Sequence, residues 1–171
     1  MQRAPVEEES AEERLTALVE AHQETLLKIC YVCLRDREAA RDAVQETYLK
    51  AYRAMHSFRG ACSEKTWLIR IAVNECRSMR RSAWHRRVDR RVTPEELLVA
   101  ADARDEAAAD VMAAVLSLPR RYREAVTLYY WQDMTVQEIA GVLGVAQSTV
   151  SVRLRQARER LRHVLEGRED E

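Results

Sequence analysis

Residues 135–160 read TVQEIAGVLGVAQSTVSVRLRQARER, a stretch that decides the architecture of this chain. Thr135 and Glu138 have the T-x-x-E spacing of a capping box, in which the two residues satisfy each other's backbone N–H, so a helix is expected to start here. Gly144 follows as a residue that adopts positive φ and ends such a helix. A second amphipathic helix comes next and turns Val150 inward. Cap, glycine and second helix in this order predict a helix-turn-helix.

The outward side of the second helix is polar and cationic. Its candidate DNA-contacting residues are Gln147, Ser148, Thr149, Ser151, Arg153, Arg155 and Arg158. A recognition helix uses polar residues near its N-terminus for base edges and cations for phosphates. The pattern therefore predicts DNA binding, with an ordinary pair of surface helices as the alternative.

Composition favours an all-α protein. The 171 residues include only four glycines and three prolines, and 28 Lys and Arg balance 28 Asp and Glu. The zero net charge hides segregation, because Arg59–Arg91 and Gly144–Leu165 are strongly basic. The balancing acids gather in residues 7–24, 92–118 and 166–171. Segregated charge indicates separate surfaces for separate partners.

Helical periodicity and helix-end signals predict two small helical domains joined by a flexible linker, the second domain containing the helix-turn-helix. We expect a disordered acidic N-terminus (1–9), a first domain (10–84), the linker (85–104), a second domain (105–165) and an acidic tail (166–171). Helices are expected at about 10–34, 37–56, 66–84, 105–117, 119–131, 136–143 and 147–165.

Two cysteines have the C-x-x-C spacing of some metal and redox sites. Cys30 and Cys33 lie within a long helical pattern that has no turn residue between them. Small apolar core residues are the favoured interpretation, with a zinc or redox centre as the alternative.

Other signals concern location and chemistry. No apolar run approaches the roughly 20 residues of a membrane span, and no signal peptide opens the chain, so a cytoplasmic protein is expected. The histidines and carboxylates form no recognisable catalytic triad or metal-ligand pattern. We therefore expect no enzymatic activity, no metal and no cofactor.

Three motifs extend this interpretation to most of the chain. They are DAVQETY at 42–48, FRG at 58–60 followed by TWLIRIAVN at 66–74, and LSLPRRYRE at 116–124. In this order and spacing they resemble regions 2.2, 2.3–2.4 and 4 of bacterial RNA polymerase sigma factors of the extracytoplasmic-function (ECF) group. The chain departs from many members of that group at Ser151 and Val152, which follow the Thr-Val of the second helix.

The resemblance implies a function and a set of partners. It implies a sigma factor that binds core RNA polymerase and reads the −10 and −35 promoter elements, in single-stranded and double-stranded DNA respectively. The second helix of the helix-turn-helix would read the −35 element. An anti-sigma partner is expected, with no membrane contact except through that partner. We also expect the free chain to be extended or mobile and an inhibited complex to be compact.

The resemblance further assigns residues. Those expected to bind core polymerase are Asp42, Gln45, Glu46 and Leu49. Those expected at the −10 element are Arg59, Lys65, Trp67, Arg70, Asn74, Arg77, Arg80 and Arg81. The basic residues suit phosphate, Asn74 suits a base edge, and Trp67 suits either stacking or core packing.

One rival function explains part of the pattern. A stand-alone helix-turn-helix regulator with an N-terminal sensing domain accounts equally well for residues 105–165. It leaves the basic, Arg-rich helix of the first domain unexplained.

Overall fold

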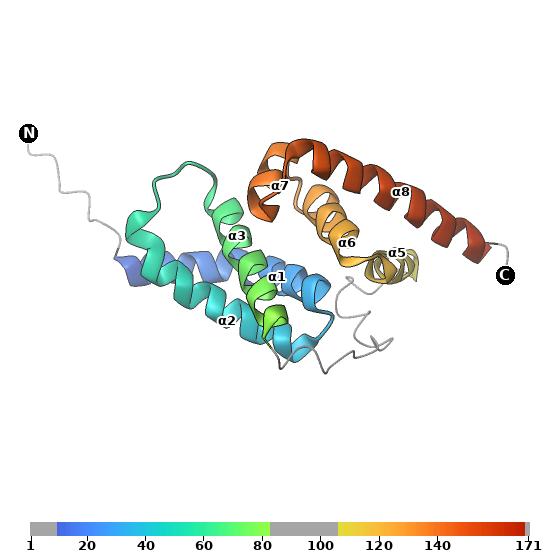
Figure 1. Cartoon of the computed structure of the whole chain (residues 1–171). Coiled ribbons are helices and arrows are strands. Elements are labelled where there is room, and N and C mark those ends of the chain that lie inside the picture. Colours follow the sequence, from blue (N-terminus) through green and yellow to red (C-terminus); the bar gives the residue numbers. More distant parts are fainter. Residues whose placement is uncertain (1–9, 83–105, 170–171) are drawn as a thin grey trace, which may run out of the picture.

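The computed structural model describes residues 10–82 and 106–169, which form helices and no strand (Figure 1). The first domain contains α1 (Ala11–Leu34), α2 (Arg37–Ala54), the short 3-10 turn η1 (Met55–Ser57) and α3 (Glu64–Arg81). Its three α-helices all pack against one another. The prediction of two all-α domains is confirmed for these residues.

Local hydrogen bonds explain where the first helices begin. Ser10 and Glu13 form a complete capping box at α1, and the Asp36 carboxylate accepts from the backbone N–H of Ala39 at α2. Helix α3 begins at Glu64, two residues before the expected start near Thr66, because the Ser63 hydroxyl caps it. Side-chain acceptors at helix N-termini satisfy backbone donors that otherwise have no partner.

The second domain contains α5 (Glu106–Ser117), α6 (Arg120–Val126), the π-helical turn η3 (Thr127–Trp131), α7 (Val136–Leu143) and α8 (Gln147–Glu169). Pro119 separates α5 from α6, as expected from its restricted backbone. The single helix expected at 119–131 is instead an α-helix that continues into the π-helical turn. The predicted bounds of α7 are confirmed, whereas α8 continues beyond the expected residue 165.

The two domains pack against each other. Helix α3 lies beside α7, and α1 contacts α6 (Figure 1). One cluster of buried apolar residues includes members of both domains. The expectation of an extended free chain is therefore wrong for this structure, in which α1 and α3 of the first domain meet α6 and α7 of the second in a seam.

Several predictions concern segments that lie outside the described residues. They include the N-terminus (1–9) and the whole of the linker (85–104). The expected end of the third helix near Trp84 is wrong, because α3 ends at Arg81 and Ser82 is already extended. Among the residues that are described, no helix is both long and apolar enough to cross a membrane.

Candidate nucleic-acid interface

The helix-turn-helix is built as the sequence predicts. The Thr135 hydroxyl accepts from the Glu138 backbone N–H at 3.2 Å, and the Glu138 carboxylate accepts from the Thr135 N–H at 2.9 Å. Gly144 ends α7 in the left-handed region at φ 64°. Ala140 and Val150 are buried where α7 and α8 pack. These contacts set the angle at which α8 leaves the turn.

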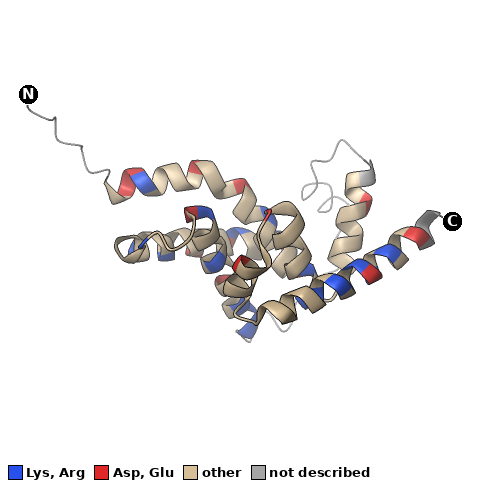
Figure 2. Cartoon of the chain, turned by 90° about the horizontal axis from the view of Figure 1, so that it is seen from above, with Lys and Arg blue, Asp and Glu red and all other residues tan. Residues whose placement is uncertain are grey.

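Helix α8 presents most of its predicted DNA-contacting residues to solvent. Gln147, Ser148, Ser151, Arg155 and Arg158 are exposed, and Thr149 and Arg153 are half-buried. Basic residues recur along much of the helix (Figure 2). This arrangement suits the N-terminal part of α8 for base edges and the cations beyond it for phosphate.

Arg158 also has a role within its own domain. Its Nε donates to the Tyr130 hydroxyl at 2.7 Å, and its guanidinium lies 5.8 Å from the ring centroids of Tyr129 and Tyr130. These contacts orient Arg158 on an exposed face. They leave guanidinium N–H groups free to meet an anion, since Arg has five donors.

In the first domain, α3 and the loop before it carry the expected −10 residues. Arg59, Arg70, Asn74 and Arg81 are exposed. Trp67 is half-buried and packs against Phe58, with ring centroids 4.9 Å apart. The packing interpretation of Trp67 is thereby supported for the side of the ring that meets Phe58.

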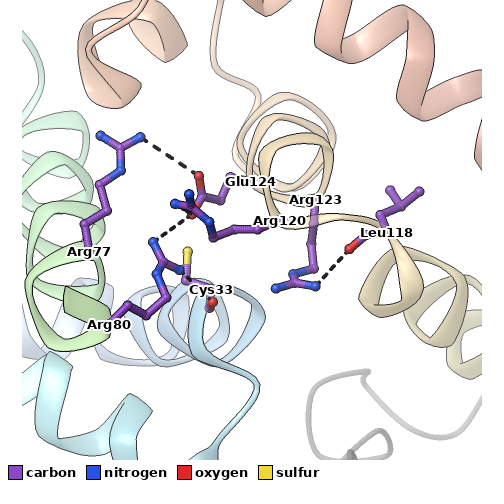
Figure 3. Close-up of polar contacts among 7 residues, drawn as sticks. All are labelled: Cys33, Arg77, Arg80, Leu118, Arg120, Arg123 and Glu124. Carbon is purple, nitrogen blue, oxygen red and sulfur yellow. Dashed lines mark hydrogen bonds and ion pairs between the residues drawn. The ribbon is translucent and has the colours of Figure 1, made fainter. Parts of the chain in front are cut away.

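The remaining expected −10 residues lie against the second domain. Arg80 Nη2 pairs with Glu124 Oε1 at 3.1 Å, and Arg77 Nη2 lies 3.9 Å from Glu124 Oε2 (Figure 3). Lys65 Nζ donates to the Gln132 carbonyl at 3.4 Å. Arg70 approaches α7 so closely that a Cβ added to Gly141 would lie 3.2 Å from its Nη2. In this arrangement the second domain covers part of the basic face of α3.

Glu124 is a residue of the seam that the sequence analysis missed. It is only 2% exposed, and its carboxylate also meets Arg120 Nη1 at 3.5 Å (Figure 3). The i, i+4 spacing of Arg120 and Glu124 was a readable signal. The partners on α3 were not readable, because they lie more than 40 residues away.

A further cation, Arg123, lies next to Glu124 on α6. Arg123 is buried and donates from Nη1 to the Leu116 and Leu118 carbonyls at 3.1 and 2.9 Å. Burial, followed by the positive charge of Arg35, lowers the pKa of Arg123 to about 10. The seam therefore holds guanidinium groups from both domains.

A different face of the first domain is open to a partner. Asp42, Gln45, Glu46 and Leu49 are all exposed on α2, as expected. Leu49 is 48% exposed, and Tyr52, which the sequence analysis did not select, is 41% exposed. Apolar groups of this size on a polar helix face suit a protein contact.

Three of the four cysteines lie in the core, and Cys62 is only partly buried. Cys30, Cys33 and Cys76 are buried. A hydrogen bond with Cys76, followed by burial, raises the pKa of the Cys33 thiol well above its usual range. A hydrogen bond with Cys30, together with burial, does the same for Cys76, although its hydrogen bond with Cys33 lowers its pKa. Protonated thiols of this kind behave as small apolar residues. Within 10–82 and 108–166, no group of three or more His, Cys, Asp or Glu has a metal-binding arrangement.

Comparison with known families identifies both domains. The family model for sigma-70 region 2 matches residues 18–86, and that for sigma-70 region 4 matches residues 108–161. The first match favours a sigma factor over a stand-alone regulator, because a sensing domain would not be expected to match region 2.

Relatives and solved structures agree with these matches. The chain is 32% identical over 163 residues to the RNA polymerase sigma-H factor of Pseudomonas aeruginosa, covering 87% of this chain and 84% of that protein. It is 34% identical over 150 residues to the ECF RNA polymerase sigma factor SigM of Mycobacterium tuberculosis, covering 86% and 75%.

Two solved structures share the fold. The sigma factor RpoE, in complex with the anti-sigma factor NepR from Bartonella quintana, matches with a TM-score of 0.76 at 23% identity, over 90% of this chain and 98% of that one. CnrH, in complex with the cytosolic domain of CnrY, matches with a TM-score of 0.69 at 25% identity, over 91% and 90%. The chain therefore belongs to the ECF group of sigma-70 factors, which bind core RNA polymerase and direct it to initiate transcription at promoters.

Proposed function

We propose that the exposed face of α2, formed by Asp42, Gln45, Glu46 and Leu49, binds core RNA polymerase. Tyr52 extends this face by about one and a half turns beyond Glu46. The proposal is supported by an exposed leucine and tyrosine among polar side chains. Burying such groups on binding is favourable by roughly 25 cal/mol per Å² of apolar surface.

For promoter opening, we propose that α3 and its preceding loop capture the unpaired −10 element through Arg59, Lys65, Trp67, Arg70, Asn74, Arg77, Arg80 and Arg81. The observation that carries this proposal is an exposed Asn74 on the same helix as four arginines. An amide both donates and accepts hydrogen bonds, so it suits a base edge. The arginines suit the backbone phosphates. Full access of DNA to this face requires the second domain to move away from α3.

The −35 element is assigned to α8. We propose that Gln147, Ser148, Thr149, Ser151 and Arg155 contact base edges, and that Arg153 and Arg158 contact phosphates. Most of these side chains are exposed, and α8 is held by the capped turn before it. A helix presented in this way matches the width of the DNA major groove.

The remaining proposals concern setting and regulation. We propose a cytoplasmic, non-enzymatic protein that works without a cofactor and is restrained by an anti-sigma partner. Such a partner is supported by CnrH, which shares this fold at 25% identity and was solved in complex with the cytosolic domain of CnrY. Either the α2 face or the α3 face offers it a surface.

Transcription in vitro with core polymerase on a promoter library tests the promoter-specific function.

The variant Asn74→Ala tests the −10 assignment. Losing one base-edge contact of about 1–3 kcal/mol should lower open-complex formation on linear DNA by about tenfold. Permanganate footprinting measures this opening. Ser78→Ala, an exposed change one turn further along α3, is the matched control.

A pre-melted bubble template separates base capture from melting. If Asn74 reads an unpaired base, its loss weakens binding to the bubble as well, while binding to an isolated −35 duplex stays at the wild-type level. Wild-type footprints on both promoter templates would remove Asn74 from the −10 site.

A further inference from the structure

A cavity of about 420 Å³ opens at the seam between the two domains. Its lining consists of Arg77, Arg80, Arg81, Arg120, Arg121, Glu124 and Arg153. These residues come from α3, α6 and α8, so the cavity exists only while the domains are together. Figure 3 shows Arg77, Arg80 and Arg120 directed toward the Glu124 carboxylate from both sides.

The charge of this cavity is unbalanced. Six arginines line it, and Glu124 is the one carboxylate in the lining among the described residues. That carboxylate is shared by Arg77, Arg80 and Arg120. The guanidinium groups repel one another because they carry the same charge, and this repulsion is stronger where water is displaced from between them. The closed arrangement is therefore short of negative charge at the place where the domains meet.

We propose that the cavity binds a compact oligophosphate anion of three or more linked phosphates, which holds the two domains together. Guanidinium groups match phosphate oxygens with two parallel hydrogen bonds. An oligophosphate carries about one negative charge per phosphate, as a nucleic-acid backbone does, so a short chain offsets most of the excess.

The lining distinguishes this ligand from other anions. None of the described residues that line the cavity is aromatic, so recognition by these residues rests on the phosphates and accepts either an inorganic chain or a nucleoside polyphosphate. An acidic peptide would bring apolar groups, which a lining of arginines and one glutamate does not complement. The major groove of a DNA duplex is by itself about 12 Å wide, and the whole duplex is wider. A duplex therefore does not fit in a cavity of about 420 Å³.

This inference rests on the proposed function for its consequence. Arg77, Arg80 and Arg81 are assigned to the −10 element, and Arg153 to the −35 element. An oligophosphate that engages these arginines and closes the seam competes with promoter DNA for them. It binds the closed state only, and therefore shifts the population toward that state.

Isothermal titration of the full chain with sodium tripolyphosphate, ATP and orthophosphate, at constant ionic strength, tests the proposal. We expect one tripolyphosphate per chain, with ATP of similar affinity and orthophosphate at least about tenfold weaker, because a single phosphate reaches fewer arginines. ATP binding at least tenfold tighter than tripolyphosphate would identify a nucleotide as the source of the phosphates.

The double variant Arg120→Gln/Arg121→Gln should weaken tripolyphosphate binding by at least about tenfold, since charge-assisted hydrogen bonds are lost. Neither residue belongs to the proposed DNA contacts. The control, Arg41→Gln/Arg53→Gln, removes the same charge from exposed positions of α2 outside the cavity lining and should bind as wild type. Arg81→Gln, a single exposed change, is the second variant, and melting curves verify that each variant folds.

Equal weakening in both double variants, several anions per chain, or equal effects of orthophosphate and tripolyphosphate would overturn the proposal in favour of general ionic attraction. A polyglutamate peptide that binds wild type while tripolyphosphate does not would assign the cavity to a protein partner instead. The titration contains no DNA or polymerase, so a failure of the proposed promoter function leaves its result unaffected.

Discussion

At the scale of single residues, Glu46 and Leu49 show how one helix combines a buried apolar side with a side that is exposed to solvent. Both are exposed on α2, whereas Ala43 and Ala51 of the same helix are fully buried. Leu49 in particular exposes 48% of its surface. Residues of this kind contribute to binding more than to folding.

Reversing one charge on this face tests that separation. Glu46→Lys should change the free energy of unfolding by no more than about 0.5 kcal/mol, because exposed positions tolerate substitution. It should nevertheless abolish recovery of core polymerase in a pull-down, since like charges across an interface are strongly unfavourable. Glu20→Lys, an exposed reversal on α1, is the control. Early melting of Glu46→Lys, or normal recovery of polymerase, would contradict the assignment.

At the scale of elements, α7 depends on the local hydrogen bonds of its capping box. The backbone and side chain of Thr135 both donate to the Glu138 carboxylate, and these bonds lower the pKa of Glu138 below its usual value. A carboxylate with a lowered pKa stabilises the fold above its unfolded pKa, and this contribution is lost as the pH falls through the folded pKa.

Glu138→Gln should therefore change the pH dependence of stability in the acid range. We expect the wild type to be more stable than the variant near pH 7, and the difference to shrink below about pH 4.5, where the carboxylate begins to protonate. Urea unfolding at a series of pH values measures this. Glu20→Gln, an exposed change outside the helix caps, should leave the curve unchanged. A stability difference that is constant from pH 7 to pH 3 would argue against the cap.

Helix α8 combines internal and external contacts at Arg158. If this residue meets a phosphate, Arg158→Ala should lower the slope of log affinity against log salt by about one unit and weaken binding to all sequences alike. Tyr130→Phe is the matched control, because it removes the hydroxyl that Arg158 contacts and keeps the guanidinium. Fluorescence titrations over a salt series decide the point. An unchanged slope with altered sequence preference would assign Arg158 to a base.

At the scale of the whole molecule, Glu124 joins two domains that other charges push apart. Its carboxylate is buried and pairs with Arg80 across the seam at 3.1 Å. Removing one partner of a buried pair leaves the others uncompensated, at a cost of about 3–5 kcal/mol. Because the pair spans two domains, much of this cost is avoided if the domains separate.

Glu124→Gln should therefore separate the two domains under conditions in which each domain stays folded. We expect a larger radius of gyration in small-angle scattering and tighter binding to single-stranded −10 DNA, because the face of α3 becomes accessible. Glu24→Gln removes an exposed carboxylate on α1 and should leave both measurements unchanged. A variant that stays compact and binds DNA as wild type does would show that Glu124 does not control closure.

Several features could be predicted because they are local. The capping boxes at Ser10 and Thr135, the Asp36 cap and the turn at Gly144 each depend on residues within a few positions of one another. The polar faces of α2 and α8 follow from helical periodicity in the same way. For this reason the all-α fold, the helix-turn-helix and the exposure of Glu46 follow from the order of the residues alone.

Other local details depended on competition between neighbouring signals. Ser63 and Thr66 both offer a hydroxyl near the start of α3, and the structure uses Ser63 as the cap. The π-helical turn at Thr127–Trp131 contains no glycine or proline that would indicate it in the sequence. Such choices depend on how the side chains of the whole domain pack, which periodicity does not report.

The sequence by itself therefore determined the helices, their caps, the turn of the DNA-binding motif and the segregation of charge. Only the tertiary structure decided that Arg77 and Arg80 meet Glu124, that the basic face of α3 is partly covered, and that six arginines surround one cavity. The physical reason is separation along the chain. Hydrogen bonds over three or four residues are specified by local order, whereas ion pairs over more than 40 residues form only after both domains have folded and met.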